Sequence, residues 1–473
     1  MGTNYETIIG LEVHAELSTK SKIFCGCSTV FGEAANTQVC PVCSGMPGAL
    51  PVLNRAVVEC AVKTGLALNC GITQDCKFDR KNYFYPDLPK AYQVSQLYLP
   101  ICRDGHLDIG GKKIGIREIH MEEDAGKLIH GADGSTHMDF NRCGVPLLEI
   151  VTNPDFRNAG EVDTYLTRLR EILLYLGVCD CKMQEGSLRV DVNLSVRKKG
   201  AKAFGTRTET KNLNSFKAVS RAIAYETARQ IAVVEAGGKV IQETRRWDDD
   251  KGESYGMRSK ENAQDYRYFP EPDLLPISIS NEWLERIGKD MPELAEAKRA
   301  RYTKDMGLPQ YDAEILTHHK NISDLFESIA QASKQPKEAV NLITGDIMRL
   351  LKSAGIPPED LGVDGGKLAT LVTYVTTGKI SRNAYKEAVE AVFADNADPE
   401  EYIKSKGLFM VSDTGAAAKA AAEIVAANPA AAADYRAGTG KAFGYLMGQL
   451  MKKLGGTANT ETAKKALEAE LKK

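Results

Sequence analysis

Alternation of apolar and polar residues predicts two long β-strands in the first half of the chain. From Ile9 to Leu17 every second residue is apolar, and the polar positions between them include Glu12 and His14. Residues 188–196 alternate in the same way, with Asp191 and Asn193 at polar positions. A strict period of two is typical of a strand with one buried face and one polar face.

Helical periodicity appears between these strands. Over residues 161–176 the apolar positions follow a spacing of three and four, and Gly177 supplies a stop signal. A second helix is predicted from about residue 214 to 236, before Gly237 and Gly238. Residues 1 to about 290 therefore read as a strand-rich α+β region.

From about Met291 onward the pattern changes to short helices rich in Ala, Lys, Glu and Leu. We expect three domains, 1–290, 291–400 and 401–473, of which the second and third are helical. The last stretch, Lys441–Lys473, holds seven Lys and three Glu, so its local charge is +4. That charge suits either a solvated helical face or contact with a polyanion.

Composition narrows the class of protein. The 473 residues are 43% hydrophobic and 26% charged, with a net charge of −2, which excludes a disordered chain and a globally basic nucleic-acid binder. No apolar run approaches the roughly 20 residues of a membrane span, and the N-terminus resembles no export signal. We expect a cytoplasmic protein.

The cysteines point to a metal site. All 11 lie between Cys25 and Cys181, and four of them form two short-spaced pairs, Cys25/Cys27 and Cys40/Cys43. Two such pairs separated by a loop supply the four thiolates of a tetrahedral zinc site. The alternative is a set of unliganded thiols. A four-thiolate site has no open position for water, so its role would be structural.

Carboxylates with one imidazole form a second constellation. Glu12 and His14 share a strand face, Glu122, Glu123 and Asp124 follow an apolar-alternating segment, and Glu149 is embedded in an apolar run. A buried carboxylate needs a partner charge or a metal. Oxygen ligands with one imidazole favour Mg²⁺ or Mn²⁺ over zinc. The alternative is a solvated strand face with scattered salt bridges.

Two loops combine cations and aromatic rings, at residues 79–93 and 265–273. Either could receive a phosphate and a base, although packed loops share this composition. The sequence has no G-x-x-x-x-G-K-[ST] motif, so a nucleotide would bind without a P-loop.

Six segments together resemble the GatB family, which comprises the B subunits of the tRNA-dependent amidotransferases. The segments are IGLEVH (9–14), DRKNYFYPD (79–87), HMEEDAGK (120–127), KNLNSF (211–216), DYRYFPEPD (265–273) and GKAFGYLMGQ (440–449). They span essentially the whole chain in order. The resemblance implies a cradle-like catalytic domain, a helical domain and a tRNA-binding tail.

The resemblance also implies an activity, that of a ligase which depends on ATP and hydrolyses glutamine. A protein of this family phosphorylates the side-chain carboxylate of misacylated Glu-tRNA(Gln) or Asp-tRNA(Asn), and ammonia then displaces phosphate. The implied partners are the amidase subunit that releases the ammonia, the small third subunit of the heterotrimer, and the misacylated tRNA. The implied cofactors are ATP with Mg²⁺ or Mn²⁺, while zinc would be structural.

The family's site residues can be placed on matching positions. Its metal ligands correspond to Glu12, His14, Glu123 and Glu149, with Glu122 as a weaker match because neighbours on a strand face opposite ways. Its essential cation corresponds to Lys81, which we assign with Arg80 and Tyr83 to ATP. We expect Lys81, Glu123 and Asp191 to be catalytic, with Asp191 serving a second metal or the incoming ammonium.

Two other functions compete with this one. A zinc-stabilised RNA-binding protein without catalysis would explain the cysteine loop and the basic tail, but would leave the carboxylates idle. A self-sufficient glutamine hydrolase would need a nucleophile such as Cys143, and the chain lacks the Gly-Gly-Ser-Ser run of signature amidases.

Overall fold

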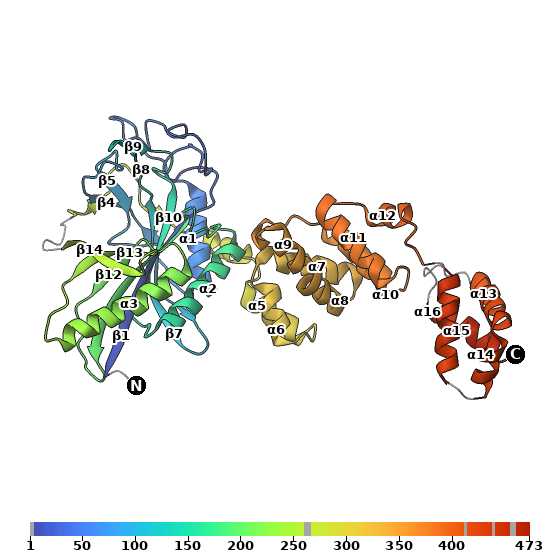
Figure 1. Cartoon of the computed structure of the whole chain (residues 1–473). Coiled ribbons are helices and arrows are strands. Elements are labelled where there is room, and N and C mark those ends of the chain that lie inside the picture. Colours follow the sequence, from blue (N-terminus) through green and yellow to red (C-terminus); the bar gives the residue numbers. More distant parts are fainter. Residues whose placement is uncertain (1–3, 260–265, 411–413, 438–439, 455–459) are drawn as a thin grey trace. The chain divides into compact units, whose positions relative to one another are not determined.

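The computed structural model describes residues 4–259, 266–410, 414–437, 440–454 and 460–473. Its contacts divide the chain into two units, Met1–Leu294 and Ala295–Lys473 (Figure 1). The first unit holds the strands and the second is helical, which confirms the α+β class.

The first unit is built on a nine-stranded sheet of order β14-β13-β12-β11-β1-β10-β7-β6-β2. Neighbouring strands are antiparallel except β12 and β13, which run parallel. The strands are β1 (Tyr5–Glu16), β2 (Gly71–Ile72), β6 (Cys102–Asp108), β7 (Lys113–Glu123), β10 (Pro146–Thr152), β11 (Leu188–Lys198), β12 (Thr208–Lys211), β13 (Glu243–Asp248) and β14 (Glu253–Ser259).

Three small sheets accompany the large one, with orders β15-β4-β5, β16-β3 and β8-β9. Their strands are β3 (Asp75–Cys76), β4 (Asp79–Asn82), β5 (Tyr92–Ser95), β8 (Lys127–His130), β9 (Thr136–Asp139), β15 (Phe269–Pro270) and β16 (Ile277–Ser278). Because β15 pairs with β4, the two cation-rich loops noted in the sequence lie side by side. Asp265 of the second loop lies outside the described residues.

The alternation predicted for the first strand is confirmed. Ile9, Leu11, Val13 and Ala15 are all buried, and they belong to one core with three helices, α1 (Arg55–Ala67), α2 (Ala159–Leu176) and α3 (Phe216–Glu235). Figure 1 shows these helices beside the sheet. One face of β1 is thus covered by helices, and its other face is left for polar side chains.

The two predicted helices are also confirmed, with ends set by local chemistry. The Asn158 side chain accepts the Glu161 amide at the start of α2, and Gly177 ends it with φ of 66°. Ser215 caps α3 by accepting the amide of Ala218. A side-chain cap satisfies an amide that has no partner in the first turn, and glycine adopts the left-handed conformation without strain.

The remaining helices complete the two units. They are α4 (Asn281–Lys289), α5 (Ala295–Lys304), α6 (Gln310–Thr317), α7 (Lys320–Ser333), α8 (Pro336–Asn341), the π-helical turn η1 (Leu342–Ile347), α9 (Met348–Ala354), the 3-10 turn η2 (Pro358–Asp360), α10 (Gly365–Thr376), α11 (Arg382–Asp395), α12 (Pro399–Ser405), α13 (Thr414–Ala427), α14 (Pro429–Arg436), α15 (Gly440–Lys453) and α16 (Thr460–Leu471). One apolar cluster runs from Tyr302 to Ile403 and a separate one from Ala420 to Leu471.

Stability of the first unit should depend on the buried carboxylate of Glu226. It accepts hydrogen bonds from Thr208 on β12, at 2.8 Å, and from Gln230, at 2.9 Å, and it pairs with Arg229. Removing one partner of a buried charged network leaves the others uncompensated. We expect Glu226→Ala to lower the free energy of unfolding by about 3–5 kcal/mol.

Tryptophan fluorescence during denaturation measures this loss selectively, because both tryptophans, Trp247 and Trp283, belong to the first unit. Glu235→Ala on the exposed end of α3 is the control, and it should change stability by less than about 0.5 kcal/mol. Equal effects of the two substitutions would contradict the role of Glu226.

Candidate functional site

Strand register gathers the acidic residues on the polar face of the large sheet. In the antiparallel pairs around β1, Glu12 lies opposite Asp191 of β11, and His14 lies opposite Glu149 of β10. Leu147 of β10 lies opposite Glu122 of β7. Residues directly opposite each other point to the same face, as do residues two apart. Five chemically active side chains from four strands therefore converge.

These side chains line a cavity of about 1190 Å³. Within it, His14, Glu122 and Glu149 each present a ligand atom within 4.8 Å of the others. His14 Nε2 lies 3.5 Å from Glu122 Oε1. One imidazole and two carboxylates within this distance form a donor set that could bind a divalent cation such as Mg²⁺ or Mn²⁺.

The charges of this first cluster are strongly coupled. Burial disfavours the imidazolium of His14, but its hydrogen bond to Glu122 and the charges of Glu149 and Asp191 outweigh burial and raise its pKa to about 9. Burial raises the pKa of Glu149, and the neighbouring charge of Glu122 adds to that rise. In the metal-free protein His14 is thus protonated at neutral pH, and a metal ion would displace that proton.

Lys81 brings a positive charge to the same cavity. Burial lowers its pKa, but the charges of Glu122, Tyr268 and Glu149 dominate and raise it. Its ammonium lies 5.0 Å from the ring centre of Tyr266 and 5.8 Å from that of Tyr83. An ammonium fixed between rings and carboxylates is suited to a phosphate group.

A second acidic cluster lies along the same face. Glu12, Asp191 and Glu209 present carboxylate oxygens within 4.8 Å of one another. Lys211 Nζ contacts Asp191 at 2.5 Å and Glu209 at 3.1 Å. Asn193 Nδ2 donates to Glu12 Oε1 at 3.0 Å. The structure thus divides the predicted ligands between two clusters and places Glu12 with Asp191.

Glu123 is predicted as a metal ligand and catalytic residue, and the structure places it apart from the other predicted ligands. Neighbouring residues of a strand face opposite sides, so Glu122 points into the large cavity while Glu123 points away from it. Glu123 Oε1 accepts from Lys90 Nζ at 2.5 Å and from the Val94 amide at 2.9 Å. It lines a separate cavity of about 250 Å³.

Arg80 is predicted to bind the nucleotide with Lys81 and Tyr83, and the same alternation places it apart from them. Lys81 and Tyr83 line the large cavity, whereas Arg80 lines the smaller one. Its guanidinium makes a bidentate pair with Glu271, both distances being 2.8 Å, and contacts Asp273 at 2.9 Å. Its Nε and Nη2 donors are thus bound to carboxylates that follow β15.

Sequence reasoning also missed Glu209 and Lys211. They alternate along β12 with Thr208 and Thr210, which are fully buried. That short alternation is a signal that Glu209 and Lys211 share the opposite face. Their placement beside Asp191 depends on the pairing of β12 with β11.

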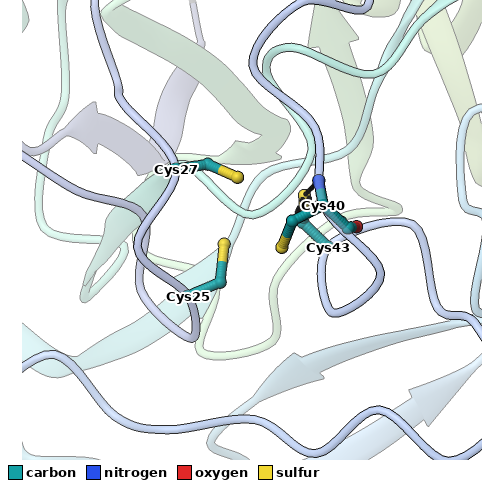
Figure 2. Close-up of side chains that lie close together, drawn as sticks. All are labelled: Cys25, Cys27, Cys40 and Cys43. Atoms are coloured by element: carbon teal, nitrogen blue, oxygen red, sulfur yellow. Dashed lines mark hydrogen bonds between the residues drawn. The ribbon is translucent and has the colours of Figure 1, made fainter.

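The four cysteines of the predicted zinc site lie together. Their sulfur atoms are within 4.8 Å of one another, and those of Cys40 and Cys43 are 3.9 Å apart. Tetrahedral zinc with Zn–S bonds of about 2.3 Å separates sulfurs by about 3.8 Å. Figure 2 shows the four side chains turned toward one another. The arrangement therefore fits a four-thiolate zinc ion.

Thiol acidities in this group are uneven even without metal. The hydrogen bond between Cys25 and Cys43 is the largest cause, and it lowers the pKa of Cys43 to about 4 while raising that of Cys25. The amide of Cys40 donates to Cys43 Sγ at 3.2 Å. Cys43 is therefore the sulfur most readily present as a thiolate, which is the form that binds metal.

Cys143 does not suit the nucleophile of a glutamine hydrolase. It is 2% exposed, and burial raises its pKa to about 12. Its thiol donates to the backbone carbonyl of Cys43. A catalytic thiol needs access and a lowered pKa, so the structure disfavours that alternative.

Among the described residues, no helix is long and apolar enough to cross a membrane.

Comparison with known proteins shows the family of the chain. Residues 7–285 match the family described as the GatB/GatE catalytic domain, and residues 324–471 match the GatB domain. The B subunit of an aspartyl/glutamyl-tRNA(Asn/Gln) amidotransferase from Lachnoclostridium phytofermentans is 57% identical over 99% of both chains. Proteins of the same name from Lachnospira eligens and Caldicellulosiruptor bescii are 56% and 54% identical, covering 99% of this chain and 100% and 99% of their own. The chain therefore belongs to the GatB family, the B subunits of the aspartyl/glutamyl-tRNA(Asn/Gln) amidotransferases.

Proposed function

We propose that this chain uses ATP to activate the side-chain carboxylate of a misacylated tRNA, Glu-tRNA(Gln), Asp-tRNA(Asn) or both, for amidation. The observation that supports the proposal is the large cavity in which His14, Glu122, Glu149 and Lys81 converge. A carboxylate is a poor electrophile, so replacing its oxygen by ammonia requires a leaving group. Phosphoryl transfer depends on positioning and charge neutralisation, and this cavity provides both.

The proposed reaction has two steps. A carboxylate oxygen of the aminoacyl side chain attacks the γ-phosphorus of ATP, and ADP leaves. Ammonia then attacks the acyl carbon and inorganic phosphate leaves, giving the amide. We assign the ammonia supply to a partner amidase, which together with this chain and one small further protein would form a heterotrimer. We place the reaction in the cytoplasm.

The two clusters suit different parts of this chemistry. We assign His14, Glu122 and Glu149 to a Mg²⁺ or Mn²⁺ ion, and Glu12 with Asp191 to a second cation. Such an ion would neutralise phosphate charge when bound. We assign Lys81 to the phosphates of ATP. Asp191 can accept the proton that ammonium must lose before it attacks.

The cysteine cluster shares no residue with the acidic clusters of the large cavity. A zinc ion bound by all four thiolates would have no open coordination position. We assign it to a structural zinc ion that orders the loop from Cys25 to Cys43. The tail cluster around α13 to α16 has its own apolar core, and we assign it to contact with the tRNA body. Gly438 and Thr439, which precede α15 in this cluster, lie outside the described residues.

The first prediction tests the acidic cavity. In the purified complex, His14→Ala or Glu149→Gln should reduce ATP-dependent amidation by at least about 10²–10³, because an electrostatic clamp on the phosphates is lost. The glutaminase activity of the partner amidase should be unchanged. Amidation of misacylated tRNA and glutamine hydrolysis are measured in parallel.

Glu6→Gln is the matched control, because Glu6 lies on the same strand and face but pairs with Arg197 away from the cavity. It should amidate normally. Normal amidation by Glu149→Gln would show that this carboxylate is wrongly assigned. Absence of tRNA-stimulated ATP hydrolysis in the unmodified complex would instead favour an RNA-binding protein without catalysis.

The second prediction concerns zinc. Purified under reducing conditions, the chain should contain about one zinc ion, and Cys40→Ser should lose it. Because structural zinc contributes on the order of 10–16 kcal/mol to small zinc-finger peptides, the loop from Cys25 to Cys43 should become sensitive to protease. Elemental analysis and limited proteolysis measure the two effects. A zinc-free wild-type chain would exclude the assignment.

The third prediction concerns the tail. Truncation after Met410 should weaken tRNA binding and raise the apparent KM for tRNA, leaving ATP binding and zinc content unchanged. Met410 is chosen because its amide still bonds to Lys379 of the preceding helical cluster. Each lost phosphate contact should reduce the salt dependence of binding by about one unit of slope. Binding isotherms at several salt concentrations test this, and an unchanged slope would refute the tail's role.

A further inference from the structure

A buried lysine adjoins the cysteine cluster. Lys22 has a relative exposure of 0%. Its ammonium donates to the carbonyl of Gln38 at 2.7 Å, to Cys43 Sγ at 3.6 Å and to the carbonyl of Phe140 at 3.4 Å. Its backbone amide donates to the carbonyl of Cys27 at 2.9 Å. Lys22 is thus in contact with both cysteine pairs.

The electrostatic surroundings of Lys22 are unusual for a buried lysine. Within the described part of the chain, no carboxylate forms an ion pair with it. Lys90 and Lys298, whose ammonium groups are also largely buried, contact Glu123 and Glu327 respectively. An isolated ammonium transferred out of water is strongly unfavourable unless an opposite charge compensates it. Two neutral carbonyls solvate the ammonium of Lys22 but supply no such charge, which leaves the sulfur of Cys43 and the thiolate cluster to which it belongs.

A zinc ion held by four thiolates would supply it. Four thiolates carry a charge of −4 and zinc carries +2, so the centre is a dianion, and Cys43 is the sulfur that Lys22 contacts. We propose that Lys22 is the buried counter-charge of this centre and that its N–H···S bond tightens metal binding. This inference rests on the proposed structural zinc and extends it to a residue outside the cysteine motif.

The contacts of Lys22 also give the centre a mechanical link. Gln38 belongs to the cysteine loop, whereas Phe140 lies in the segment between β9 and β10. The ammonium therefore joins the loop, a zinc ligand and this segment at one point. Lys22 also lines the cavity of about 250 Å³ that contains Lys90 and Glu123. Loss of the metal would leave the Cys43 sulfur as the one anionic group among the contacts described for the ammonium of Lys22.

Metal affinity provides the direct test. In the full-length chain, Lys22→Met should weaken zinc binding by about 10–100-fold in chelator competition, the range found for residues that support metal ligands. Lys22→Arg, which keeps the charge and the donors, should recover most of the loss. Lys298→Met removes a buried lysine from the second unit, which contains no cysteine, and should leave zinc affinity unchanged.

Two further readouts separate a counter-charge from a merely structural role. With Co²⁺ in place of zinc, Lys22→Met should shift the thiolate-to-cobalt charge-transfer band to lower energy, because a sulfur without its N–H donor is richer in electrons. In the Cys40→Ser background, Lys22→Met should cost less stability than in the wild-type chain, because the dianionic centre is absent and only the Cys43 sulfur remains beside the ammonium. A purely structural lysine would cost the same stability in both backgrounds.

The outcomes are distinct. Unchanged zinc affinity and an unshifted cobalt band in Lys22→Met would overturn the role of Lys22 while leaving the zinc site intact. Absence of metal from the wild-type chain would overturn the zinc assignment and this inference with it. Neither result touches amidation, which is tested through His14 and Glu149.

Discussion

The hydrogen-bonded register of β1 between β10 and β11 is the constraint on which the site depends. It sets His14 opposite Glu149 and Glu12 opposite Asp191, and the burial of the odd-numbered residues beneath three helices forces the even-numbered ones to the open face. Like charges so close together would repel, so the site exists only with cations between them. Lys81, Lys211 and protonated His14 play that part in the metal-free chain, and divalent ions would take it over in the proposed reaction.

Local pattern predicted β1, β11, α2 and α3 because a period of two or 3.6 is a property of neighbouring residues. It also placed Glu12 and His14 on one face. The pattern also held a signal for the facing of Glu123: Ile119 and Met121 are buried, so Glu123, two residues further, belongs to their face and Glu122 to the other. The predicted metal-ligand role of Glu123 came instead from the family resemblance, which was carried over by position. For Arg80 the sequence contained no such signal, because its partner Glu271 is remote in sequence and β4 has no apolar alternation.

Sequence reasoning could not predict contacts between distant segments, because periodicity is a property of neighbouring residues. The spacing of the cysteines indicated zinc, yet nothing in it indicated that Lys22 would be enclosed by Gln38 and Phe140. Pairing of Lys211 with Asp191 likewise follows from the order of β12 and β11 in the sheet. In both cases a lysine contacts thiol or carboxylate side chains that segments distant in the sequence bring together.

At the end of β7, two adjacent residues line different cavities. Glu122 faces the large cavity and Glu123 faces the small one. This arrangement restricts how the gene can change. Insertion or deletion of a single codon in β7 near these residues would exchange the two carboxylates between the cavities, because every side chain beyond it would turn to the opposite face. Gains or losses of two codons would preserve the facing. We therefore expect the length of this strand to differ among related sequences by even numbers of residues. The turn before Lys113, in contrast, can gain or lose a single residue.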